Sequence, residues 1–93
     1  MKVSGAQITA ARNLLKITQE ELAVDSGVSE QTVKRFEADH TLPQRATLAK
    51  ILSALERRGI EFTNGTGIGV RLNFEKAAEF ARAAGLARKQ ADH

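Results

Sequence analysis

Residues 18–37 read TQEELAVDSGVSEQTVKRFE, and this stretch decides the fold. Thr18 is a good N-cap, and Glu21 three residues later completes a capping box that starts a helix over about residues 19–26. Gly27 follows and suits the left-handed conformation that ends a helix. Ser29 is then the next N-cap. The stretch therefore predicts two short helices joined by a glycine turn.

The spacing of apolar residues predicts that these two helices pack on each other. Val33 and Phe36 lie three residues apart on one face of the second helix, where they point toward Leu22 and Val28. The opposite face of the second helix is left outward and is polar. It carries one amide, two cations and one carboxylate, from Gln31, Lys34, Arg35 and Glu30. All four groups can hydrogen-bond to base edges or to phosphates.

The stretch closely resembles the phage-repressor-like helix-turn-helix family, also called the Cro-like or xenobiotic-response-element family. The shared pattern opens as T-Q-x-E-L-A, passes the turn glycine Gly27, and ends in a polar helix with the late glutamate Glu37. The resemblance covers roughly residues 5–58. It implies a compact four-helix domain whose third helix enters the major groove of double-stranded DNA.

The resemblance also implies roles for individual residues. The glutamine that opens the second helix anchors to a phosphate in this family, which maps onto Gln19, and a first-helix arginine pairs with the late glutamate, which maps onto Arg12 and Glu37. Glu30 departs from the neutral amide common at its position, so it either reads a cytosine amino group or points away from the DNA. The segment Ala38-Asp39-His40 replaces a turn that often contains glycine. The candidate DNA-binding residues are Gln19, Ser29, Glu30, Gln31, Thr32, Lys34, Arg35, His40 and Arg45.

Two further helices complete the expected domain. Ser4 with Gln7 resembles a capping box for a helix to about residue 15, with an inward stripe of Ile8, Ala11, Leu14 and Leu15. A fourth helix should run over about residues 45–58, ending at Gly59, with Leu48, Ile51, Leu52 and Leu55 inward. Gln44, Arg45 and Thr47 open this helix and could contact phosphate.

After Gly59 the pattern changes to alternation. Residues 60–63 and 68–72 predict a hairpin around Asn64-Gly65. An isolated hairpin is marginal in water, so it must pack on the helices, pair with a second subunit, or both. We favour a homodimer formed through Ile60, Phe62, Ile68, Val70 and Leu72, and the alternative is a hairpin that covers the fourth helix of one monomer.

The predicted architecture is mainly α. Asn73 can cap a last helix over about residues 74–89, which is rich in alanine. The expected division is a helix-turn-helix domain over residues 1–59 and a hairpin-plus-helix dimerisation extension over residues 60–93.

Composition limits the remaining possibilities. The 93 residues allow one small domain, and the absence of cysteine excludes disulfides and thiolate metal sites. No apolar run approaches the roughly 20 residues that span a bilayer, and no apolar signal core opens the chain, so we expect a cytoplasmic protein without membrane contact. Gly65, Gly67 and Gly69 are followed by Val70-Arg71-Leu72, which resembles a strand, whereas a nucleotide-binding glycine loop opens a helix, so we expect no cofactor.

The sequence predicts a DNA reader and no enzyme. Its two histidines, His40 and His93, have no second histidine at metal-ligand spacing, and its acidic residues resemble a solvated helix face. The net charge of +3 is small, so DNA binding would depend on where the cations lie. We interpret the chain as a sequence-specific transcriptional regulator, a repressor that binds a near-palindromic site as a homodimer. The alternatives are an antitoxin that binds a protein partner through the region after Gly59, or an adaptor that has lost DNA contact.

Overall fold

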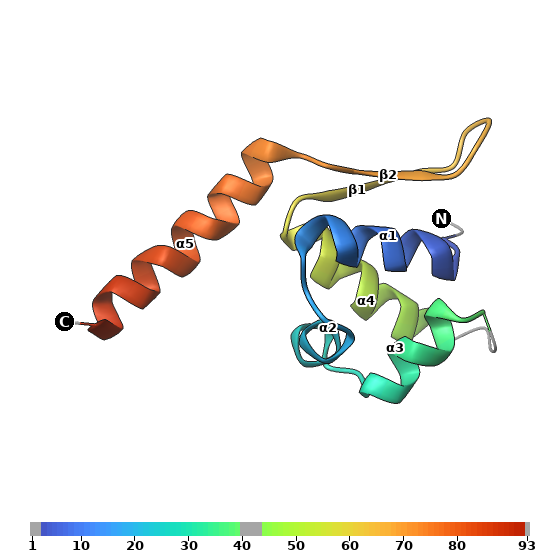
Figure 1. Ribbon diagram of the computed structural model, residues 1–93, viewed down its shortest axis with the longest axis horizontal. Coiled ribbons are helices and arrows are strands. Elements are labelled where there is room, and N and C mark those ends of the chain that lie inside the picture. Colours follow the sequence, from blue (N-terminus) through green and yellow to red (C-terminus); the bar gives the residue numbers. More distant parts are fainter. Residues whose placement is uncertain (1–2, 40–43, 93) are drawn as a thin grey trace.

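The computed structural model describes residues 3–39 and 44–92, with side chains described through residue 85. The predicted mainly α fold is confirmed: four helices are followed by an antiparallel hairpin and a C-terminal helix (Figure 1). In chain order the elements are α1 (Gly5–Leu15), α2 (Gln19–Ser26), α3 (Glu30–Glu37), α4 (Arg45–Arg57), β1 (Ile60–Thr63), β2 (Gly69–Leu72) and α5 (Phe74–Asp92).

Local sequence sets the helix boundaries as predicted. Complete capping boxes open α1 at Ser4 and α2 at Thr18. Gly27 ends α2 with a φ of 74°, in the left-handed region that glycine adopts without steric cost. The Ser29 side chain accepts a hydrogen bond from the backbone N–H of Thr32 and thereby caps α3.

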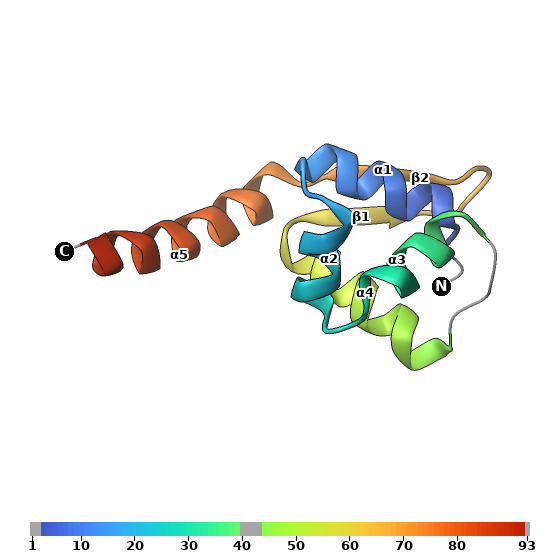
Figure 2. The same ribbon diagram turned by 60° about the horizontal axis from the view of Figure 1, so that its bottom comes forward.

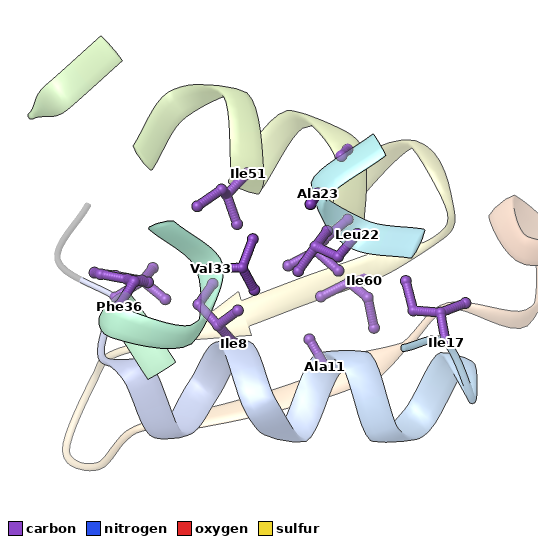
Figure 3. Packing of buried hydrophobic residues seen from close by; sticks show 12 residues of the cluster. Ile8, Ala11, Ile17, Leu22, Ala23, Val33, Phe36, Ile51 and Ile60 are labelled. Atoms are coloured by element: carbon purple, nitrogen blue, oxygen red, sulfur yellow. The ribbon is translucent and has the colours of Figure 1, made fainter. Parts of the chain in front are cut away.

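One core holds α1 to α4 and the first strand together. The largest fully buried side chains come from all five elements: Ile8, Leu22, Val33, Ile51, Leu55 and Ile60. Figure 3 shows the labelled members of this group meeting between the helices and the first strand. Helices as short as α2 and α3 are unstable in isolation, so this burial is what maintains them.

One expected core residue lies outside the core. Leu14 is 45% exposed, whereas its neighbour Leu15 packs against the buried cluster. Ile8, Ala11 and Leu15 share one side of the helix at the spacing i, i+3, i+7, and Leu14 is turned about 100° from Leu15, away from that side. The prediction that both belong to the inward stripe of α1 is therefore wrong for Leu14.

The hairpin packs on the helices of its own chain. Its register pairs Ile60 with Leu72 and Phe62 with Val70. Gln7 of α1 is 3% exposed, and its Nε2 donates hydrogen bonds to the carbonyl oxygens of Thr63 (3.2 Å) and Gly69 (3.0 Å). This buried amide fixes the turn end of the hairpin, where Thr63 pairs with Gly69, to the first helix.

The last helix, α5, projects from the bundle. Asn73 caps it as predicted, since its Oδ1 accepts a hydrogen bond from the backbone N–H of Lys76 at 3.1 Å. It ends at Asp92, three residues beyond the expected end. Two views show it leading away from the helices and the hairpin (Figure 1, Figure 2). No helix in the described ranges is long and apolar enough to cross a membrane.

Truncating the buried amide should loosen the hairpin. Gln7→Ala leaves the carbonyls of Thr63 and Gly69 without their side-chain donor and removes half of the α1 capping box. We expect the free energy of unfolding to fall by about 1–3 kcal/mol, measured by urea denaturation. The matched control, Gln31→Ala at an exposed position, should change it by less than about 0.5 kcal/mol. Equal effects of the two substitutions would contradict the role given to Gln7.

Candidate nucleic-acid interface

The second helix of the motif, α3, presents a polar face to solvent. Val33 and Phe36 are buried beneath it, while Gln31, Lys34 and Arg35 are exposed. α2 and α3 lie on the side of the bundle away from the hairpin (Figure 1). The predicted outward face of α3 is therefore open to a large partner on that side.

The start of α3 is ordered by its own side chains. The Oγ of Ser29 accepts from the backbone N–H of Thr32 at 3.1 Å, and the hydroxyls of the two residues lie 2.7 Å apart. Ser29 is exposed and Thr32 half-buried. Both hydroxyls can still exchange hydrogen bonds with a phosphate or a base edge, because each carries a donor and two acceptor positions.

Glu30, the unusual carboxylate of this face, is neutralised by its own helix. The Nζ of Lys34 lies 2.9 Å from a Glu30 oxygen, at the i, i+4 spacing. The hydrogen bond to Glu30, followed by the attraction of its charge, raises the pKa of Lys34 above its usual value. Arg35 has no ion-pair partner within the described residues. On this face, the side chains of Gln31 and Arg35 thus form no hydrogen bond or ion pair with another described residue.

A carboxylate at the end of α3 connects three helices. The side chain of Glu37 is 7% exposed, and its Oε2 accepts from the Arg12 Nε at 2.9 Å. Its Oε1 accepts from Thr9 Oγ1 at 2.9 Å, from Arg12 Nη2 at 3.1 Å and from Gln19 Nε2 at 3.1 Å. The ion pair that the family resemblance implied is present, and it is reinforced by two uncharged donors.

The same contacts set the protonation of Glu37. Burial acts to raise its pKa, but hydrogen bonds from Arg12, Gln19 and Thr9, together with the Arg12 charge, outweigh this effect and lower the pKa below its usual value. The group is therefore ionised at neutral pH and holds Arg12 in place.

Gln19 is fixed by this cluster at the start of α2. One hydrogen of its Nε2 is used on Glu37, while the amide carries a second donor hydrogen and an acceptor oxygen. The residue is half-buried, so part of it is open to solvent. The side chain assigned to a phosphate is thus oriented before any ligand arrives.

The start of α4 offers a further polar group. Arg45 is exposed at the first position of the helix, and Gln44, the N-cap, forms no capping hydrogen bond through its side chain. The first backbone N–H groups of α4 therefore have no side-chain acceptor from the cap, which suits an anion. His40 lies outside the described residues.

The residues expected to form a dimer contact are mostly engaged within the protomer. Ile60 is fully buried, and Phe62, Val70 and Leu72 pack against the core, whereas Ile68 is 62% exposed. The apolar side chains of the hairpin therefore leave little surface for a second subunit.

Some important contacts had weak signals in the sequence. Thr9 lies three residues before Arg12, on the same side of α1, which is a faint indication that the two share a partner. The contacts of Gln7 had none, since two of its acceptors are backbone carbonyls of a hairpin more than fifty residues away.

Comparison with known proteins agrees with this geometry. A protein-family model described as helix-turn-helix matches residues 8–62, which is more than half of the chain and includes every described residue of the candidate interface. A comparison with curated proteins found no match.

Removing the Glu37 charge should destabilise the fold in a pH-dependent way. Glu37→Gln leaves Arg12 without its counter-ion, and we expect the free energy of unfolding at pH 7 to fall by about 1.5–3 kcal/mol. A lowered folded-state pKa gives stability that is present above the unfolded pKa and is lost as pH falls through the folded pKa. The difference from wild type should therefore shrink on acidification, in urea titrations from pH 7 to pH 3. A difference that stays constant, or one matched by the exposed control Glu20→Gln, would refute this role.

Proposed function

Since the chain belongs to the helix-turn-helix family of DNA-binding regulators, of the Cro-like type, we propose that it is a sequence-specific transcriptional repressor. The observation that carries the proposal is the exposed polar face of α3, which is ordered at its start by Ser29 and Thr32 and fixed at its end by Glu37. A helix of this kind fits the major groove, which is wide enough to admit it.

Base reading is assigned to the exposed face of α3. Gln31 reads adenine, because its amide can donate a hydrogen bond to adenine N7 and accept one from the N6 amino group in a single bidentate contact. Arg35 reads guanine through O6 and N7, with Lys34 as the second cation of this face. Glu30 acts mainly by holding Lys34, and their mutual neutralisation reduces the repulsion between this carboxylate and the phosphates.

Phosphate contacts are assigned to the flanks of α3. Gln19 of α2 and Thr32 of α3 donate hydrogen bonds to phosphates on one side. On the other side, phosphates are bound by Arg45 and the first backbone N–H groups of α4. His40 remains in the proposed set because of its position in the sequence. Support comes from the orientation of Gln19 by Glu37, which leaves one amide hydrogen and the amide oxygen for the backbone of the DNA.

A homodimer on a near-palindromic operator completes the proposal. Two α3 helices occupy successive major grooves, so half-site centres lie roughly 10 base pairs apart or a multiple of that. Repression follows if the bound dimer covers a promoter. The net charge of +3 is low for a DNA-binding protein, so affinity depends on these placed contacts and on binding two half-sites.

Selection from a random duplex library, followed by sequencing, tests the proposal directly. An enriched inverted repeat supports both the reader and the dimer, and its spacing gives the geometry. A single enriched half-site retains the reader and removes the dimer. No enrichment at low salt, from protein that is folded by circular dichroism, would refute DNA reading and favour an adaptor.

Two glutamine substitutions should separate base reading from phosphate binding. Gln31→Ala should weaken binding to the selected site by about 1–3 kcal/mol and leave binding to unrelated duplexes nearly unchanged, because it removes a base contact. Gln19→Ala should weaken binding to every sequence alike, because it removes a phosphate contact. Fluorescence anisotropy with the selected and a scrambled duplex measures both. A uniform loss for Gln31→Ala, or a change of specificity for Gln19→Ala, would reverse the assignments.

A further inference from the structure

The C-terminal helix, α5, is fixed to the bundle along one side near its start. The backbone N–H of Asn73 donates to the carbonyl of Gly59 at 2.7 Å, and a Cβ built on Gly59 would lie 2.9 Å from the backbone nitrogen of Ala77. The guanidinium of Arg58 lies 4.7 Å from the centre of the Phe80 ring, and the same guanidinium is paired with Asp25 of α2 at 2.9 Å. These contacts define an inner side of α5, which includes Ala77 and Phe80.

The outer side of α5 has no partner within the described residues, although it carries the most exposed large apolar side chain among them. Phe74 is 81% exposed. Ala78 follows one turn later, and it and Ala81 are exposed as well. A shallow depression on this side is lined by Phe74, Glu75, Ala78, Glu79 and Arg82. Phe74 and the exposed alanines together form an apolar strip that no other described residue covers.

The charges on this side are self-complementary when one copy is reversed. Glu75 lies in the first turn of α5, and Arg82 lies seven residues later, about 10 Å along the axis. Neither forms an ion pair with another described side chain. In an antiparallel pair of α5 helices related by a two-fold axis next to Ala78, each Glu75 faces the Arg82 of the other copy.

We propose that the outer side of α5 is the homodimer contact, in which two copies of this helix pack antiparallel across Ala78 and Ala81. This inference rests on the dimer of the proposed function and specifies its interface. Each Phe74 lies against the Arg82 guanidinium of the second copy, a contact of the same kind as that of Arg58 with Phe80 inside the protomer. The alanines allow the two helix axes to approach to about 8 Å.

A second copy fits this surface better than the hairpin contact does. Four of the five apolar hairpin residues already pack in the protomer, whereas the outer side of α5 is open. An isologous contact needs one surface that carries both charges in register, and α5 supplies both within seven residues. The paired length is at most about 28 Å, at 1.5 Å per residue, so the interface is small and the free dimer is weak. Binding of both protomers to one duplex then raises their effective concentration.

Charge reversal combined with mixing tests the contact. Glu75→Arg places like charges opposite Arg82 in both contacts of the dimer, and Arg82→Glu does the same opposite Glu75. Each variant alone should raise the dimer dissociation constant at least about tenfold in sedimentation equilibrium, since two like-charge contacts replace two ion pairs. An equimolar mixture of the two variants restores opposite charges at both contacts and should return the constant to within about threefold of wild type. Phe74→Ala should raise it about tenfold, and mixing should not rescue it.

Matched controls keep the result interpretable. Glu20→Arg and Lys50→Glu make the same charge changes at exposed positions outside α5, and both should dimerise as wild type does. Unchanged thermal unfolding would establish that the α5 variants remain folded. Monomeric wild-type protein at high concentration, dimers insensitive to charge reversal, or mixtures that fail to reassociate would each overturn the proposal.

The dimer measurement needs no DNA, so its outcome is independent of the proposed DNA reading. Anisotropy with a single half-site duplex at low salt reports DNA binding by the monomeric variants. If the single variants lose the dimer and their mixture regains it, but neither the variants nor the wild-type protein binds DNA, the dimer contact stands and the repressor proposal falls. If half-site binding persists but charge reversal does not weaken the dimer, or mixing does not restore it, the DNA reader stands and the α5 contact falls.

Discussion

The Glu37 carboxylate is the contact on which the arrangement of the helix-turn-helix depends. It lies at the end of α3 and receives hydrogen bonds from Thr9 and Arg12 of α1 and from Gln19 of α2. An ionised group this deeply buried is tolerated only because charged and uncharged donors together replace its water. The requirement is directional, since each donor must reach the same two oxygens. It therefore fixes the relative positions of α1, α2 and α3 more sharply than apolar packing alone.

This constraint reaches the proposed DNA contact through Gln19. The apolar core joins the same helices but tolerates small shifts, because burial of apolar surface depends little on direction. The hydrogen bond from Gln19 to Glu37 sets the amide at the start of α2 relative to the end of α3. A protein with a net charge of only +3 gains little from general attraction to DNA. For such a protein, orienting the contacts before binding reduces the entropy lost on association.

The hairpin and α5 differ in a way that the sequence pattern alone could not show: the hairpin packs within the protomer, whereas α5 leaves apolar surface exposed. The hairpin turns its apolar side chains toward the helices, and Gln7 holds its turn end, so the hairpin acts mainly as part of the protomer. α5 contacts the bundle through Phe80 and leaves Phe74 in solvent. In the segment after Gly59, the exposed apolar side chain of Phe74 thus lies on α5, while the apolar side chains of the two strands are largely packed against the helices.

The sequence by itself determined the helix boundaries, the turn at Gly27 and the family, because capping residues, glycine and 3.6-residue periodicity act over a few neighbouring residues. It also identified the Arg12–Glu37 pair, although only through family resemblance. It predicted the hairpin from alternation and Asn64-Gly65, whereas the connection in the structure is a five-residue loop over residues 64–68. Only the tertiary structure decided that Leu15 and not Leu14 enters the core, that Gln7 holds the hairpin, and that the apolar side of the strands is consumed within the protomer. These outcomes depend on contacts between residues that lie far apart in the chain, and a local sequence pattern carries no information about such contacts.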